Sequence, residues 1–163
     1  MVILGIDPGF AIVGYGALES IRGKCSVLTY GAITTPAHTD MEKRLSEIFH
    51  DLNKLLDMLR PDAVAIEELF FNTNTTTAIN VAQARGVILL ACAERGIPVS
   101  EYTPLQVKQA VVGYGRAEKK QVMEMTRTML GLEKTPKPDD AADALALALC
   151  HSANAGSLLS GLN

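Results

Sequence analysis

The pattern of apolar and polar residues opens with three short apolar runs. The first covers residues 2–6 and stops at an Asp-Pro-Gly turn, and the next two cover residues 11–18 and 26–35, with Gly or other turn residues around them. Short apolar runs bounded by turn residues are typical of β-strands. We therefore predict three successive strands that form an antiparallel meander.

From residue 41 on, the apolar positions follow a helical spacing. Between Met41 and Leu59 they recur three or four residues apart, which predicts a helix with one buried face, and Pro61 ends it. The apolar run at 63–66 reads as a buried parallel strand that leads into Glu67. The remaining predicted elements are a helix over 78–95, a strand over 97–102, helices near 105–112 and 118–130, and a last helix after Pro138.

This order of elements predicts the fold class. Three strands followed by alternating helices and strands indicate an α/β architecture with a mixed five-stranded sheet flanked by helices. With 163 residues, 48% of them hydrophobic, the chain is large enough for one core. We expect a single domain over residues 1–155 and a flexible C-terminal tail over 156–163.

Composition points to the cytoplasm. The three cysteines, Cys25, Cys92 and Cys150, are odd in number and lack short spacings, as expected of free thiols in a reducing compartment. The three histidines show no metal-ligand spacing. No apolar run reaches the length of a membrane span, and no basic stretch precedes the first apolar run as in a signal peptide.

The charge is distributed unevenly along the chain. The formal net charge is −3, yet the segment from Lys108 to Lys137 holds seven basic and three acidic residues, a local balance of +4. The basic residues are Lys108, Arg116, Lys119, Lys120, Arg127, Lys134 and Lys137. This segment is either a surface that binds nucleic acid or an ordinary solvated surface of mixed charge.

Four carboxylates stand where they could converge. Asp7 ends the first predicted strand and Glu67 ends the fourth, so parallel neighbours would place both at one sheet edge. Asp140 and Asp143 lie three apart at the start of a helix, with a rise between them of roughly 4.5 Å. Taken singly, they could instead be turn, cap or solvated residues, but Asp143 lies within an alanine-rich run that should be buried.

Such a cluster predicts metal-dependent hydrolysis. Close carboxylates repel one another, and a bound cation is the usual remedy. All-oxygen ligands suit Mg²⁺, with Mn²⁺ as a substitute, and two such ions can clamp the attacking and leaving oxygens of a phosphodiester.

Several motifs resemble one family in order and spacing. They are GIDPG at 5–9, AIEELFF at 65–71, QVKQAVVGYG at 106–115, AEKKQV at 117–122 and DDAADALALAL at 139–149. They are similar to the motifs of the RuvC family of Holliday junction resolvases. The resemblance implies a ribonuclease H-like fold, a homodimer, Mg²⁺ dependence and symmetrical paired nicking of four-way DNA junctions in recombination and repair. It also implies association with the branch-migration proteins RuvA and RuvB.

The resemblance also implies catalytic and DNA-binding roles for individual residues. The family's catalytic, metal-binding carboxylates fall on Asp7, Glu67, Asp140 and Asp143, and Glu68 stands where we would expect Gln. The expected DNA-binding residues are Phe70 or Phe71, which would wedge among junction bases, and Lys108, Arg116, Lys119 and Lys120. Two alternatives remain open: a catalytically weak junction-binding protein, and another ribonuclease H-like nuclease that acts on RNA hybrids. A sugar-kinase type of ATPase would need a second lobe, for which the chain has no room.

Overall fold

The first three strands form the expected antiparallel meander. In the computed structural model, which describes residues 1–69 and 75–160, β1 (Val2–Asp7) pairs with β2 (Ile12–Ile21) and β2 with β3 (Lys24–Thr34). Both pairings are antiparallel. The turn between β2 and β3 has Arg22 and Gly23 at positive φ, which matches the twist of a two-residue hairpin.

The sheet is completed by two parallel strands. β4 (Ala63–Glu67) lies parallel to β1, and β5 (Val99–Tyr102) lies parallel to β4, which gives the order β3-β2-β1-β4-β5. The mixed five-stranded sheet predicted from the sequence is confirmed. The parallel pairing of β1 with β4 brings their carboxyl ends, Asp7 and Glu67, to one edge.

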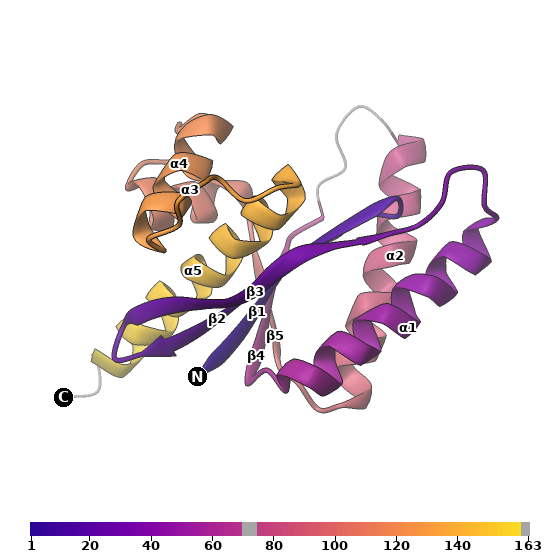
Figure 1. Ribbon diagram of the computed structural model, residues 1–163, viewed down its shortest axis with the longest axis horizontal. Coiled ribbons are helices and arrows are strands. Elements are labelled where there is room, and N and C mark those ends of the chain that lie inside the picture. Colours follow the sequence, from indigo (N-terminus) through magenta and orange to yellow (C-terminus); the bar gives the residue numbers. More distant parts are fainter. Residues whose placement is uncertain (70–74, 161–163) are drawn as a thin grey trace.

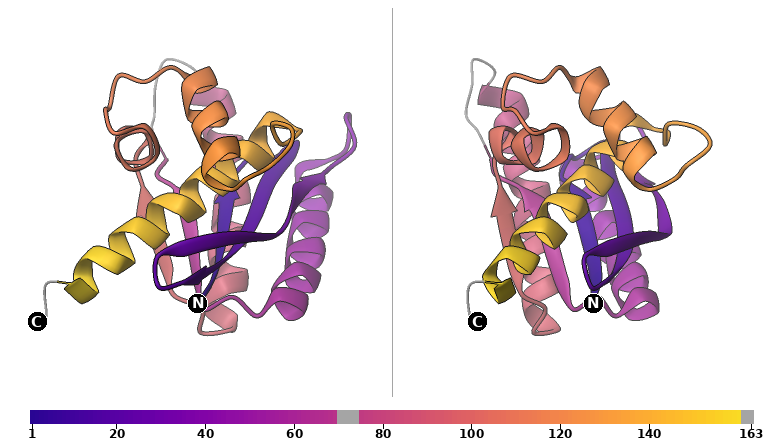
Figure 2. Two further views of the ribbon diagram at one scale, coloured as in Figure 1. Left: turned by 60° about the vertical axis from the view of Figure 1, so that its left-hand side comes forward. Right: turned by 90° about the vertical axis from the view of Figure 1, so that its left-hand side faces the viewer.

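Helices cover both faces of this sheet (Figures 1 and 2). On one face lie α1 (Met41–Leu59) and α2 (Thr75–Glu94), whose buried side chains share a core with Leu4, Val64 and Ile66. On the other face α5 (Asp139–Ser160) crosses the strands, with α3 (Pro104–Val112) and α4 (Lys119–Met129) packed on it. The layers therefore have two separate cores, one on each side of the sheet.

Glycines let α5 lie very close to the strands. A Cβ added at Gly5 would stand 1.8 Å from the carbonyl oxygen of Ala144, and one at Gly14 would stand 2.2 Å from that of Asp140. No side chain fits in such spaces, so glycine is required for this approach. The glycines of β1 and β2 therefore decide how closely the start of α5 approaches the sheet.

Two features of the helices differ from expectation. By length and composition alone, Thr76–Glu94 of α2 could cross a membrane, although the sequence pattern predicted no such span. Its Ala84, Ile88 and Ala91 nevertheless lie in the core, as in the helix of a globular domain. At the C-terminus, α5 continues to Ser160, so residues 156–160 of the expected tail are helical, and 161–163 lie outside the described residues. All three cysteines are free, as expected.

Candidate active site

The carboxyl ends of β1 and β4 open into a pocket. Its volume is about 370 Å³, and Asp7 and Glu67 contribute carboxylates to its wall. Three helices close the other sides, and the remaining lining residues are Pro104, Val107, Lys108, Lys119, Val122, Asp143, Ala146 and Leu147. Residues that are far apart in the sequence thus combine an acidic wall, two lysines and an apolar wall.

Asp143 reaches this pocket from the first turns of α5. Asp140 does not line it, although its charge raises the pKa of both Asp7 and Asp143. The close approach of α5 at Gly14 holds Asp140 against β2. The structure therefore brings three of the four predicted carboxylates to the pocket wall and leaves the fourth beside it.

Burial and mutual repulsion make the acidic groups hard to ionise together. Burial, and then the charges of Glu67, Asp143 and Asp140, raise the pKa of Asp7 to about 8. Burial is also the largest cause that raises the pKa of Glu67 and of Asp143. Each shift shows that the site disfavours negative charge unless a cation is near.

Lys119 supplies part of that positive charge. Its Nζ donates to Oδ2 of Asp143 at 2.7 Å, and this hydrogen bond is the largest cause that raises the pKa of Lys119. A capping box places the lysine, because Glu118 caps α4 and the side chain of Gln121 accepts a hydrogen bond from the Glu118 backbone N–H. Lys119 also lowers the pKa of Asp7 and Glu67, so its charge acts on the whole acidic wall.

The site has the chemistry of a divalent-cation site but not yet its geometry. Among residues 1–69 and 75–160, no three His, Cys, Asp or Glu side chains are grouped so that they could already hold a metal ion. The donors are all carboxylate oxygens, which suit Mg²⁺ or Mn²⁺. The Lys119–Asp143 contact shows that the wall accepts a positive charge at hydrogen-bond distance. A bound cation would have to draw the carboxylates closer together.

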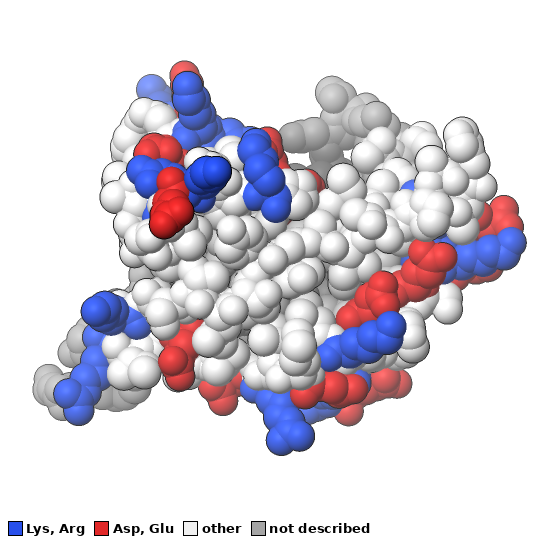
Figure 3. Space-filling model, viewed as in Figure 1, with Lys and Arg blue, Asp and Glu red and all other residues white. Residues whose placement is uncertain are grey.

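The predicted DNA-binding lysines approach the pocket from two helices. Lys108 projects from α3, whose start is fixed by a capping box between Thr103 and Gln106, and Lys119 comes from α4. Lys120 lines an adjoining pocket together with Lys119 and Lys137, and Arg116 is exposed in the turn before α4. Phe70 and Phe71 lie outside the described residues. Figure 3 shows Lys and Arg side chains gathered over the α3 and α4 part of the molecule, with acidic side chains among them.

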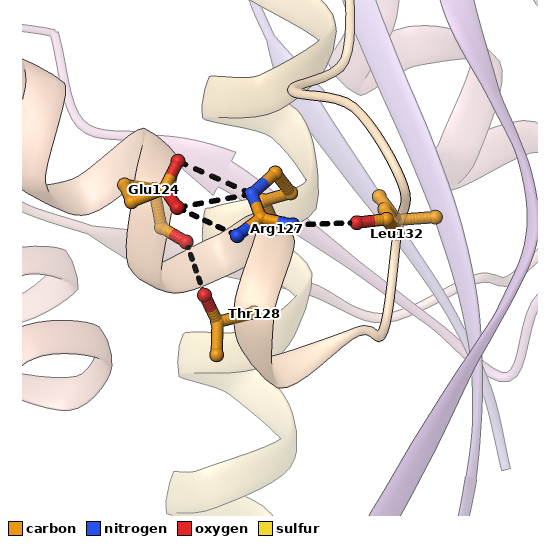
Figure 4. Close-up of polar contacts among 4 residues, drawn as sticks. All are labelled: Glu124, Arg127, Thr128 and Leu132. Carbon is orange, nitrogen blue, oxygen red and sulfur yellow. Dashed lines mark hydrogen bonds and ion pairs between the residues drawn. The ribbon is translucent and has the colours of Figure 1, made fainter.

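Some of the basic residues between Lys108 and Lys137 form ion pairs within the protein. Arg127 pairs with Glu124 at 2.6 Å and donates to the carbonyl oxygen of Leu132, which holds the chain after α4 (Figure 4). Lys137 pairs with Asp139 at 2.6 Å. Among the described residues, those of the basic segment that make no ion pair are Lys108, Arg116, Lys120 and Lys134. The charge count from the sequence therefore overstates the charge available to a ligand.

Two contributions to the site were not predicted from the sequence. The apolar wall of Val107 and Val122 comes from helices whose mutual packing has no local signal. The role of Gly14 did have a local signal in the sequence. Glycines at the alternate positions 14 and 16 of a strand indicate a close backbone approach.

Comparisons with known proteins agree with this arrangement. Residues 3–151 match the family model described as crossover junction endodeoxyribonuclease RuvC. The protein of that name from Heliobacterium modesticaldum is 63% identical over 150 residues, covering 92% of this chain and 93% of the relative. The one from Clostridioides difficile is 58% identical over 152 residues, covering 93% and 90%.

Solved structures give the same result. Thermus thermophilus RuvC in complex with Holliday junction substrate superposes with a TM-score of 0.91 at 39% identity, and 96% of each chain is covered. The yeast mitochondrial Holliday junction resolvase Ydc2 superposes with a TM-score of 0.67 at 14% identity, covering 98% of this chain and 82% of that one. The second likeness concerns the fold alone.

Proposed function

Because this chain belongs to the RuvC family of crossover junction endodeoxyribonucleases, we propose that it resolves Holliday junctions by cutting DNA strands at the pocket between β1, β4 and α5. The observation that supports this most is the meeting of Asp7, Glu67 and Asp143 with Lys108 and Lys119 in one pocket. Carboxylates with raised pKa values beside lysines suit a site that takes cations and phosphates together.

The cofactor that we propose is Mg²⁺, with Mn²⁺ as a substitute and two ions per site. Asp7, Glu67, Asp140 and Asp143 would hold it. When bound, such ions activate a water and stabilise the charge that develops on the phosphate. The protein's own acids then stay ionised at neutral pH, because the cation offsets the repulsion and burial that raise their pKa values.

Lysines would bind and orient the DNA backbone. Lys108 and Lys119 line the pocket from α3 and α4, and Asp7 and Glu67 line it from the ends of β1 and β4. A phosphate held by these lysines would face the carboxylates. If Lys119 leaves Asp143, its Nζ can turn to that phosphate. The same lysine would then bind Asp143 in one state of the site and the DNA phosphate in the other.

A second copy of the chain would account for paired, symmetrical cuts. A four-way junction offers two equivalent strands, and a two-fold dimer presents two equivalent sites to them. The surface that we propose for the dimer is the outer side of α2, where Ile79 and Leu90 are each more than half exposed. We extend the proposal to RuvA and RuvB as partners that place the enzyme on junctions in the cytoplasm, on family resemblance.

A cleavage assay tests the proposed function. Purified protein with Mg²⁺ should cut a synthetic mobile four-way junction into nicked duplexes, with the two nicks at symmetrical positions. Linear duplex and RNA–DNA hybrid of the same sequence should remain uncut. Faster cutting of the hybrid would instead favour another ribonuclease H-like nuclease, and tight binding with no cutting at any Mg²⁺ concentration would favour a non-catalytic junction-binding protein.

Replacing two lysines should weaken the salt dependence of junction binding. In the double variant Lys108→Gln/Lys119→Gln, we expect the slope of log affinity against log salt to fall by about 0.9 for each phosphate that the variant no longer neutralises, because fewer counterions are released. The measurement is junction affinity over a salt series in Ca²⁺, which suppresses cutting. The matched control is Lys43→Gln/Lys54→Gln on α1, where both lysines are paired with aspartates. An unchanged slope in the first variant would place the DNA path elsewhere.

Phe70→Ala should impair the cutting of intact junctions more than the cutting of substrates with bases already unpaired. An aromatic ring that stacks on an unpaired base contributes about 1 to 3 kcal/mol, and a pre-opened substrate no longer needs that contribution. Initial rates on the two substrates give the comparison. Phe71→Ala, measured in parallel, identifies which ring acts. Equal losses on both substrates would indicate a role in folding instead.

A further inference from the structure

Arg85 joins the ends of two strands behind the pocket. It lies on α2 with its side chain 13% exposed. Its Nε donates to the backbone carbonyl oxygen of Glu67 at 3.4 Å, and its Nη2 lies 2.7 Å from Oε2 of Glu101. Glu67 ends β4, and Glu101 is in the neighbouring strand β5, paired with Ile66. One guanidinium group therefore spans the carboxyl ends of β4 and β5.

The buried charge of Arg85 depends on these two contacts. Within residues 1–69 and 75–160, no acceptor meets the buried Nη2 at a favourable hydrogen-bond angle, so the ion pair with Glu101 is its main compensation. Because Glu101 is 48% exposed, the pair itself adds little net stability, but breaking it would leave the largely buried guanidinium without its partner charge. Such a pair is better suited to fixing a geometry than to stabilising the fold.

The end of β4 is where a fixed geometry matters. Regular pairing with β5 ends at Glu67 and Tyr102, followed by one hydrogen bond from the Glu68 N–H to the Tyr102 carbonyl oxygen at 2.9 Å. The Glu67 side chain lines the pocket together with the like-charged Asp7 and Asp143. Repulsion acts to push the last residue of the strand outward, and the Arg85 contact holds its backbone from behind.

We propose that Arg85 is a positioning residue that holds the end of β4, so that the Glu67 carboxylate stays aligned with Asp7 for cation binding. This rests on the proposed function, which assigns Glu67 to the cation. Arg85 does not line the pocket, and it acts through the Glu67 backbone. Groups that orient a metal ligand in this way typically change metal affinity by about 10- to 100-fold when they are removed.

Arg85→Met should weaken cation binding without weakening junction binding. We expect the dissociation constant for Mn²⁺, measured on DNA-free protein from the electron paramagnetic resonance signal of the free ion, to rise about tenfold. The Mg²⁺ concentration for half-maximal cutting should rise by a similar factor. Glu101→Gln keeps the contact of Arg85 with the Glu67 carbonyl oxygen, so the dissociation constant for Mn²⁺ should rise less than in Arg85→Met. If Arg85→Met does not fold, Glu101→Gln is the variant that tests the proposal.

Arg95→Met is the matched control. Arg95 follows the end of α2, pairs with Asp57 at 2.8 Å and is 26% exposed, but it lies far from the pocket. It should lower the melting temperature and leave the Mn²⁺ dissociation constant unchanged. Equal Mn²⁺ affinity in wild type, Arg85→Met and Glu101→Gln would overturn the proposal. A wild type that cuts no junction would overturn the proposed function instead, while the Mn²⁺ titration still decides the role of Arg85.

Discussion

Asp7→Asn, Glu67→Gln, Asp140→Asn and Asp143→Asn should each lower junction cutting by more than about a thousandfold, a barrier increase of roughly 4 kcal/mol. Each change keeps the shape of the side chain but removes a charge that would hold the cation. Junction affinity measured in Ca²⁺ should stay within about threefold of wild type, because lysines rather than carboxylates would contact the backbone. Rates are best measured under single-turnover conditions with saturating enzyme.

Two neighbouring acids provide matched controls for this prediction. Glu68 is exposed beside Glu67, and Asp139 precedes Asp140 but pairs with Lys137. Glu68→Gln and Asp139→Asn should therefore cut at nearly the wild-type rate. Any of the four main variants that keeps its rate within about tenfold of wild type would lose its assigned role.

The raised pKa of Asp7 gives a test of whether Asp7→Asn loses activity because a charge is missing or because the protein unfolds. Its pKa is about 8 in the folded, metal-free protein and 3.8 in the reference state, so the folded state binds more protons between these values. Stability in EDTA should therefore fall as the pH rises from about 4 to about 8. Asp7→Asn should remove the part of this decline that Asp7 contributes, while the raised pKa values of Glu67 and Asp143 keep the rest. Its melting temperature should therefore exceed that of the wild type at pH 8, and the difference should shrink at pH 5. A lower melting temperature of Asp7→Asn at pH 8 would contradict this.

Gly14→Ala should destabilise the protein by about 3 kcal/mol or more, and Gly5→Ala by at least as much. The added Cβ would stand 2.2 Å and 1.8 Å, respectively, from carbonyl oxygens of α5, and a helix backbone cannot yield locally. Because the displaced helix carries Asp140 and Asp143, the folded fraction of either variant should also bind Mn²⁺ more weakly. Urea denaturation gives the stability.

Gly31→Ala is the control for a strand glycine. There the added Cβ would meet Oη of Tyr15 at 2.7 Å, and the end of that side chain can move aside. The expected cost is about 1 kcal/mol or less. If Gly14→Ala and Gly31→Ala unfold at the same urea concentration, the close approach of α5 does not limit stability.

The sequence alone determined the elements and the placement of the main acids. Apolar periodicity and Pro61 bound α1 at Met41–Leu59, and Asp7 and Glu67 were recognisable as strand ends. These are local signals, because spacing, caps and turn residues act over a few positions along the chain. The parallel pairing of β1 with β4 was only a condition of the prediction, and the strand order comes from the structure.

Only the tertiary structure decided how these residues meet. Lys119 and Asp143 are 24 positions apart, and their contact depends on how α4 packs against α5. Asp140 was expected to share the pocket with Asp143 but lies beside it. Arg85 is the one basic residue in the sequence of α2, and no local pattern pairs it with Glu101 on the neighbouring strand. Such contacts arise from the packing of whole elements, to which residues distant along the chain contribute together, so short-range spacing does not encode them.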